Sequence, residues 1–163
     1  MQFSSFKTLP TILSLAYLAS SNPLPVAPQA ALDTAEVYYL SNCFNTTTND
    51  AYAAADWYED YALSQDGQTP DEIGIFNADD SIDYEDGTWV ISNPFKLEVV
   101  IGEDAYTAAA GTLVGTANSS TFAGPMNCYR ETRIVLYQPA ADIKCYSDYA
   151  CTDVSSLLSI VDE

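Results

Sequence analysis

Histidine is absent from this chain of 163 residues. Its absence excludes the Ser-His-Asp and Cys-His mechanisms of nucleophilic catalysis, and it also excludes zinc, copper and non-haem iron sites with imidazole ligands. The four cysteines include no C-x-x-C pair, so a zinc site built from cysteine alone is not favoured. Mechanisms that need only two carboxylates, as in glycosidases and aspartic proteases, remain compatible with the composition.

Positive charge is scarce. Five lysines and arginines stand against 23 aspartates and glutamates, which gives a net charge of −18 at pH 7. A surface of this sign repels DNA, RNA and anionic lipid headgroups, so we expect no nucleic acid and no membrane among the partners. It attracts metal ions, basic proteins and protonated amino-sugar polymers, although solubility alone also explains an acidic surface.

Long hydrophobic runs are missing as well. The apolar stretch at residues 9–18 is half of the roughly 20 residues that a transmembrane helix needs. It follows Lys7 and precedes Ala19-Ser20-Ser21, the small-residue pattern that signal peptidase recognises. We therefore expect a signal peptide over residues 1–21, a Pro-rich linker or pro-segment over 22–32, and a single β-rich domain over 33–163 of a secreted, extracellular protein.

Cysteines are present in an even number, at Cys43, Cys128, Cys145 and Cys151. In an oxidising exterior they predict two disulfides. The spacing leaves three pairings open, of which we favour Cys43 with Cys128 and Cys145 with Cys151. The Asn-Cys-aromatic pattern shared by residues 42–44 and 127–129 would then mark two paired strands, and the second bridge would staple a local turn.

Two N-glycosylation sequons are also present. They are Asn45-Thr46-Thr47 and Asn118-Ser119-Ser120. In an exported chain, such sequons predict exposed loops that carry glycans at Asn45 and Asn118.

Short segments rich in β-branched and aromatic residues recur along the chain, with turn residues between them. This spacing is typical of a sandwich or a closed barrel, so we predict an all-β fold with at most one short helix and two disulfides. The predicted strands are residues 36–44, 73–76, 95–101, 106–109, 112–117, 126–130, 133–138 and 143–149.

Asp86-Gly87 is the clearest turn signal, because this pair suits a two-residue type I′ hairpin turn. It predicts a hairpin over residues 81–92. Counting outward from the turn places four side chains together on the core face: Ile82, Tyr84, Trp89 and Ile91.

A helix is predicted over residues 51–63, which are mostly good helix formers behind a capping residue, Asn49 or Asp50. The alternative is a strand, since apolar and polar residues alternate in part of this segment.

Acidic residues crowd together between residues 77 and 86. Calcium takes about six to eight oxygen ligands, so this segment is a candidate cation site with Asp79, Asp80, Asp83 and Glu85 as ligands. The spacing does not match an EF-hand loop, and an exposed strand face beside a hairpin turn explains the same acids. Calcium is the one cofactor that the sequence suggests.

Aromatic residues provide candidate binding patches, because tyrosine and tryptophan rings stack on sugars and anchor protein partners. Trp57, Tyr58 and Tyr61 form one patch, and Tyr146 and Tyr149, which flank Asp148, form a second. The alternative is that these rings belong to the core.

Glu98 and Glu103, on or just after a predicted strand, are the strongest single carboxylates for a hydrolase. A solvated strand face and a turn are the favoured explanation for both. We assign no catalytic residue from the sequence.

The opening Met-Gln-Phe-Ser-Ser-Phe, the Pro-rich start, the acidic composition and the four cysteines together resemble a fungal small secreted protein of the effector-like or surface-antigen class. In bulk the chain is similar to the acidic, four-cysteine β-barrel allergens of moulds. The resemblance implies a non-catalytic role outside the cell, against a host, a competitor or the wall of the fungus itself.

These observations favour a secreted, acidic, disulfide-stabilised protein that binds a protein or a cell-wall polysaccharide. The alternatives are a carboxylate-dependent hydrolase acting on carbohydrate and a cation-binding surface protein. The sequence leaves the oligomeric state open.

Overall fold

The computed structural model describes residues 35–153, apart from 86 and 123. The predicted signal peptide and the Pro-rich segment lie outside the described residues. Within the described ranges, no helix is both long and apolar enough to cross a bilayer.

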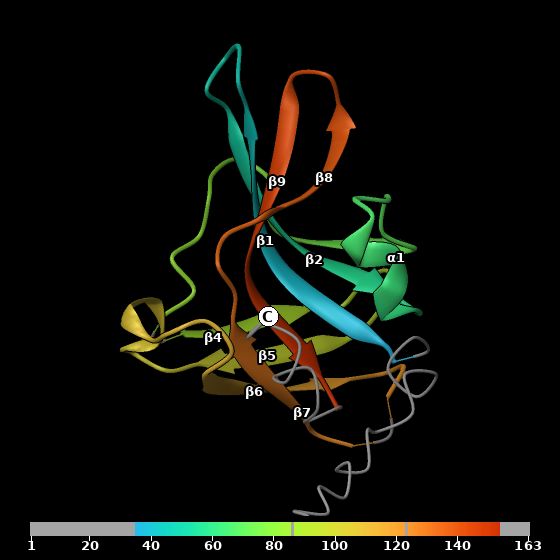
Figure 1. Ribbon diagram of the computed structural model, residues 1–163, viewed down its shortest axis with the longest axis vertical. Coiled ribbons are helices and arrows are strands. Elements are labelled where there is room, and N and C mark those ends of the chain that lie inside the picture. Colours follow the sequence, from blue (N-terminus) through green and yellow to red (C-terminus); the bar gives the residue numbers. More distant parts are fainter. Residues whose placement is uncertain (1–34, 86, 123, 154–163) are drawn as a thin grey trace, which may run out of the picture.

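The described residues form one antiparallel sheet of nine strands that curls into a nearly closed barrel (Figure 1). The order across the sheet is β3-β2-β1-β9-β7-β6-β5-β4, and β8 pairs with β9 off this path. The predicted all-β class is confirmed. The strands are β1 (Val37–Asn45), β2 (Ala51–Tyr58), β3 (Glu72–Asn77), β4 (Gly87–Ile91), β5 (Leu97–Ile101), β6 (Leu113–Ser119), β7 (Met126–Arg130), β8 (Val135–Ala140) and β9 (Ile143–Thr152).

Strand β9 is the hub of the sheet, because it pairs with β1, β7 and β8. Its register against β1 shifts once: Leu40 faces Tyr149, but Ser41 faces Ser147. Asp148 is therefore the extra residue of a β-bulge. Since side chains alternate between the two faces of a strand, one extra residue exchanges the faces for everything beyond it.

The two disulfides are Cys43–Cys145, which joins β1 to β9, and Cys128–Cys151, which joins β7 to β9. Two bridges are confirmed, but the favoured pairing is wrong. Cys145 and Cys151 lie six residues apart on one extended strand, about 20 Å at the usual rise, whereas bridged Cα atoms lie within about 7 Å. Each bridge instead connects residues directly opposite each other on neighbouring strands.

Residues 51–63 are largely a strand, so the predicted helix is wrong over most of its length. Strand β2 lies between β1 and β3, and pairing with both of them overrides the helix propensity of its alanines. A helix does form just beyond, as α1 (Tyr61–Gln65), where the side chain of Asp60 accepts a hydrogen bond from the Ala62 N–H at 2.9 Å.

The predicted 81–92 hairpin is also wrong. Strand β4 pairs with β5 instead, and residues 81–84 belong to no strand. The turn residue Asp86 lies outside the described residues. The predicted common face nevertheless holds, because four side chains pack in one cluster: Ile82, Tyr84, Trp89 and Ile91.

Residues 106–109 differ from their prediction as well. The structure has a short 3₁₀ turn there, η2 (Ala105–Thr107), in place of a strand.

Two hydrophobic clusters lie on opposite faces of β1. Tyr38 and Leu40 point into the barrel and pack there with Tyr84 and Tyr149. Val37 and Tyr39 point outward and are covered by β8 and by residues near α1. Because both of its faces are covered, β1 is buried along nearly its whole length.

Candidate functional site

A hollow of about 430 Å³ opens beside the bulge of β9. Its walls come from β1, the 81–85 segment, the η2 region and β9, and we call it the Asp148 pocket. Four aromatic side chains line it: Phe44, Tyr84, Tyr106 and Tyr149. Four carboxylates and an arginine line it as well: Asp83, Glu85, Glu103, Asp148 and Arg133.

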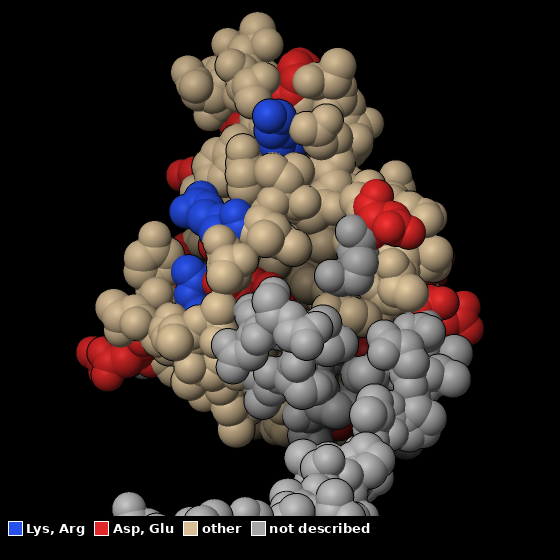
Figure 2. All heavy atoms as spheres, viewed as in Figure 1, with Lys and Arg blue, Asp and Glu red and all other residues tan. Residues whose placement is uncertain are grey.

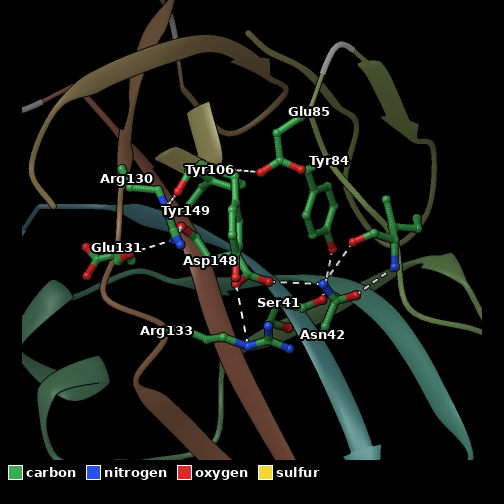
Figure 3. A network of polar contacts seen from close by, with 11 residues as sticks. Ser41, Asn42, Tyr84, Glu85, Tyr106, Arg130, Glu131, Arg133, Asp148 and Tyr149 are labelled. Carbon is green, nitrogen blue, oxygen red and sulfur yellow. Dashed lines mark hydrogen bonds and ion pairs between the residues drawn. The ribbon is translucent and has the colours of Figure 1, made fainter. Parts of the chain in front are cut away.

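Asn42 holds the walls of the pocket together. Its Oδ1 accepts a hydrogen bond from the backbone N–H of Ile82 at 2.8 Å, and its Nδ2 donates to the carbonyl oxygen of Ile82 at 3.0 Å. The same Nδ2 donates to Oδ2 of Asp148 at 3.0 Å. One buried amide therefore connects β1, the 81–85 segment and the bulge of β9 (Figure 3).

Asp148 is placed in the pocket by the bulge and is only 6% exposed. Its buried Oδ1 has no hydrogen-bond donor among the described residues, and it lies 3.8 Å from Nε of Arg133. Burial raises the pKa of Asp148, although Asn42 and the two nearby arginines act in the opposite direction. A carboxylate oxygen without water or a donor is costly, so an added donor would stabilise this group.

Arg130, at the end of β7, contacts three residues that line the pocket: Tyr106, Asp148 and Tyr149. Its Nη1 donates to the carbonyl oxygens of Asp148 at 2.7 Å and Glu131 at 2.6 Å. Its guanidinium lies over the rings of Tyr106 and Tyr149, 5.1 and 5.3 Å from their centroids. These contacts orient both rings, and Figure 3 shows Arg130 and Arg133 approaching the bulge from different sides.

Glu85 and Tyr149 form a second polar pair in the pocket. The Tyr149 hydroxyl donates a short hydrogen bond to Oε1 of Glu85. Burial is the largest cause that raises the pKa of Glu85, and the neighbouring Asp83 raises it further. The pocket therefore contains two carboxyl groups with a raised pKa, Glu85 and Asp148. Each of them keeps its proton to a higher pH than the same group in water.

Taken together, the lining groups offer two rings with exposed surface, Phe44 and Tyr106, for stacking, and several acceptors for hydrogen bonds. Four acids outnumber the lining arginine, so the pocket attracts positively charged or donor-rich ligands. Figure 2 shows basic side chains gathered along one side of the face in view, with acidic ones among them.

The first predicted aromatic patch is divided between two clusters, whereas the second lies at the pocket. Trp57 packs against the cluster inside the barrel, whereas Tyr58 and Tyr61 belong to the outer cluster, so these three rings do not share a surface. Tyr149 does line the pocket. Tyr146 packs against Phe44, a lining residue, with 6.1 Å between the ring centroids.

The four proposed cation ligands are divided. Asp83 and Glu85 line the pocket, while Asp79 and Asp80 are exposed in the turn before it. Asp80 uses its Oδ1 to accept a hydrogen bond from the Ser81 N–H at 2.8 Å. Among the described residues, no group of three or more Asp, Glu or Cys side chains is placed to hold a metal ion.

The other sequence candidates lie at separate places. Glu103 lines the pocket, but Glu98 is exposed on the outward face of β5. The sequon residue Asn45 ends β1 and is half-buried, whereas Asn118 is exposed on β6.

A further buried carboxyl group, that of Asp56, lies outside the pocket. It belongs to β2, the strand between β1 and β3. It accepts hydrogen bonds from the Tyr137 hydroxyl at 3.0 Å and, at shorter distance, from the Ser41 hydroxyl. Burial raises the pKa of Asp56 to about 7. Since Asp56 is fully buried, we regard it as part of the core.

Sequence reasoning did not identify several residues of the pocket. In the sequence, Asn42 is distinguished only by the repeated Asn-Cys-aromatic pattern, and Tyr106 falls in a predicted strand. Arg133 adopts a positive φ of 57°, for which the sequence carries no signal such as glycine. The polar residues that sequence reasoning did name were Asp83, Glu85, Glu103 and Asp148, but only sheet closure and the β9 bulge bring them together.

Comparisons with known proteins provide no family for this chain. No protein-family model, no curated protein and no solved structure matches it at a significant level.

Proposed function

We propose that this chain is a secreted, non-catalytic binding protein of the fungal small-secreted-protein class, and that the Asp148 pocket binds an amino-sugar oligosaccharide of a cell wall. The observation that carries the proposal is the presence, in one hollow, of aromatic rings and of four carboxyl groups against one lining arginine. The two disulfides are compatible with an extracellular location.

The chemistry of the lining selects the ligand. Tyr106, which is 58% exposed, offers an apolar ring face to the C–H groups of a sugar, and the Arg130 guanidinium, 5.1 Å from its centroid, orients the ring. The protonated amine of an amino sugar supplies both a positive charge and hydrogen-bond donors. Asp148, whose Oδ1 has no donor, and the more exposed Glu103 are the acceptors that we assign to it.

The test compares three soluble probes by calorimetry: oligomers of chitosan, chitin and β-glucan. We expect chitosan oligomers to bind, and Asp148→Asn to weaken their binding at least tenfold. Glu98→Gln is the matched control, because it removes an exposed carboxylate outside the pocket. Melting curves verify that each variant is folded.

Three results would count against the proposal. Equal weakening by both variants would mean attraction to the acidic surface in general. Complete loss of chitosan binding in high salt, without any pocket variant mattering, would mean the same. Failure to bind any of the three probes would indicate a protein partner.

A hydrolase is the second candidate, and one observation favours it. A general acid needs a raised pKa, and both Glu85 and Asp148 have one within the same pocket. Release of reducing ends from these oligosaccharides, abolished by Glu85→Gln or Asp148→Asn, would favour an enzyme. Binding without turnover would favour the binding protein.

A further inference from the structure

The outward face of β4, β5 and β6 carries exposed apolar side chains. Val90 is 59% exposed and Val100 is 44% exposed. An exposed apolar surface of this kind favours unwanted contact with other chains. We call this surface the β4–β6 face, which consists of Thr88, Val90, Glu98, Val100, Thr116 and Asn118.

Asn118 lies in this face and begins a sequon. The register places Val90 opposite Glu98 and Glu98 opposite Asn118, so these three residues form one row across the strands. Val100 lies diagonally across from Asn118, about 7–8 Å away for such neighbours. No hydrogen bond occupies the Asn118 amide among the described residues, and its side chain is exposed.

The other sequon is placed differently. Oδ1 of Asn45 accepts hydrogen bonds from the backbone N–H groups of Thr47 and Thr48, at 2.8 and 3.0 Å. Its Nδ2, the atom that a glycan would occupy, donates to Oδ2 of Asp142 at 3.1 Å. A sugar on this nitrogen would replace one of its two hydrogens and would lie against the turn between β8 and β9, which also receives hydrogen bonds from Thr46.

We propose that Asn118, and not Asn45, carries an N-linked glycan whose first sugars cover the β4–β6 face. The inference goes beyond the proposed ligand and depends only on the proposed export of the chain. In the transfer, Nδ2 of Asn118 loses a proton and bonds to the anomeric carbon of the first sugar. The carbon–oxygen bond to a lipid-linked diphosphate donor breaks, and the diphosphate leaves with the electron pair.

The glycan suits this face. A sugar ring has an apolar side that packs over Val100 and Val90, while its hydroxyls remain in water. Its bulk also keeps other chains from this exposed apolar surface. The same chain segment therefore supplies both the exposed apolar surface and the attachment point for its cover.

Attachment is tested by secreting the full chain from a eukaryotic host and measuring intact mass and glycopeptides. We expect a glycan on Asn118, lost in Asn118→Gln and kept in Asn45→Gln. Ser120→Ala removes the sequon without changing Asn118, and Ser120→Thr, which preserves it, is the matched control. An unoccupied Asn118, or a glycan at Asn45, would overturn the assignment.

Coverage is tested separately by retention on a hydrophobic-interaction column. Asn118→Gln should bind the column more strongly than the glycosylated protein. Val100→Thr should reduce retention in the Asn118→Gln background and change it little in the glycosylated protein. An equal reduction in both backgrounds would show that the sugars leave the face uncovered. Neither experiment involves pocket residues, so their outcome is independent of saccharide binding.

Discussion

At the scale of single residues, two buried aspartates behave differently because their neighbours differ. Asp56 receives hydrogen bonds from two hydroxyl groups and is fully enclosed. Asp148 receives one from an amide and has an arginine at a longer distance. The first arrangement satisfies a carboxyl group within the core, whereas the second leaves an oxygen in need of a donor.

Asp56 should make the stability of the protein depend on pH. Its pKa rises from the ordinary 3.8 to about 7 on folding, so between these values the native state retains a proton that the unfolded chain has lost. The contribution of Asp56 to the free energy of unfolding therefore falls as pH rises from about 4 to about 7 and is constant above that range.

The Asp56→Asn variant isolates this effect, because asparagine does not titrate and can still bond to both hydroxyls. Between pH 4 and pH 8, the stability of the variant relative to the wild type should rise by up to about 4 kcal/mol. Urea unfolding of both proteins at several pH values measures the difference in stability. The contributions of the other acids cancel in this difference, because both proteins contain them. Parallel pH profiles for the two proteins would contradict the prediction.

Asn42 should be important for both stability and the pocket. Asn42→Ala removes both hydrogen bonds to Ile82 and the donor to Asp148, for an expected loss of about 2–3 kcal/mol. Hydrogen exchange at the Ile82 amide should become at least tenfold faster. Asn127→Ala is the control, since its side chain has no hydrogen-bond partner among the described residues, and unchanged exchange in Asn42→Ala would disprove the role.

At the scale of elements, β9 determines most of the arrangement. It pairs with three strands, contains the bulge and holds one half of each disulfide. The bulge exchanges faces between the two cysteines, so Cys145 belongs to the outer cluster and Cys151 to the inner one. The two bridges thus fix β9 to different neighbours on opposite faces.

The two disulfides should differ in their contribution to stability. Their loops differ in length, with sequence separations of 102 and 23 residues. In the chain-entropy model, removal of Cys43–Cys145 costs about 4.5–5 kcal/mol and removal of Cys128–Cys151 about 3.5 kcal/mol. Urea unfolding of the two Cys→Ala double variants measures this order, and a greater loss from the shorter loop would reverse it.

Local patterns were sufficient for some elements but not for others. The strand near residues 36–44 was predictable because its aromatic and β-branched residues favour the strand that the segment forms. The strand at residues 51–58 was not predictable, since its alanines favour a helix in isolation. The segment forms a strand because it pairs with both β1 and β3. The disulfide pairing depends on which strands flank β9, and that order is not encoded in cysteine spacing.

The pocket was predictable only in its parts. Acidic residues and tyrosines could be named from the sequence as candidates. Their convergence requires the extra residue at Asp148 and the attachment of the 81–85 segment by Asn42, neither of which produces a local pattern.

At the scale of the whole molecule, the barrel nearly closes where β3 approaches β4. The approach depends on Gly74, which is buried and has no Cβ. A Cβ at this position would lie 2.8 Å from two side-chain carbons of Ile91 and 3.0 Å from Phe95. The seam between the sheet ends is therefore packed by side chains of β4 directly against the backbone of β3.

Gly74→Ala should destabilise the protein by about 1–3 kcal/mol, because it forces the two edges apart. The effect should diminish in an Ile91→Ala background, where the clashing carbons are missing. Thermal or urea unfolding of the four proteins in this cycle measures the coupling. Additive losses of stability would show that residues 74 and 91 do not interact across the seam.

The interleaved disulfides also determine what a protease could do to this protein. Cys43 is bound to Cys145, and Cys128, which lies between them in the sequence, is bound to Cys151. One cut of the backbone anywhere between Cys43 and Cys151 therefore leaves the two pieces covalently joined. With the pairing that we favoured from the sequence, Cys43–Cys128 and Cys145–Cys151, one cut between Cys128 and Cys145 would have separated the two pieces. The observed connectivity therefore keeps the barrel in one covalent piece after a single cut.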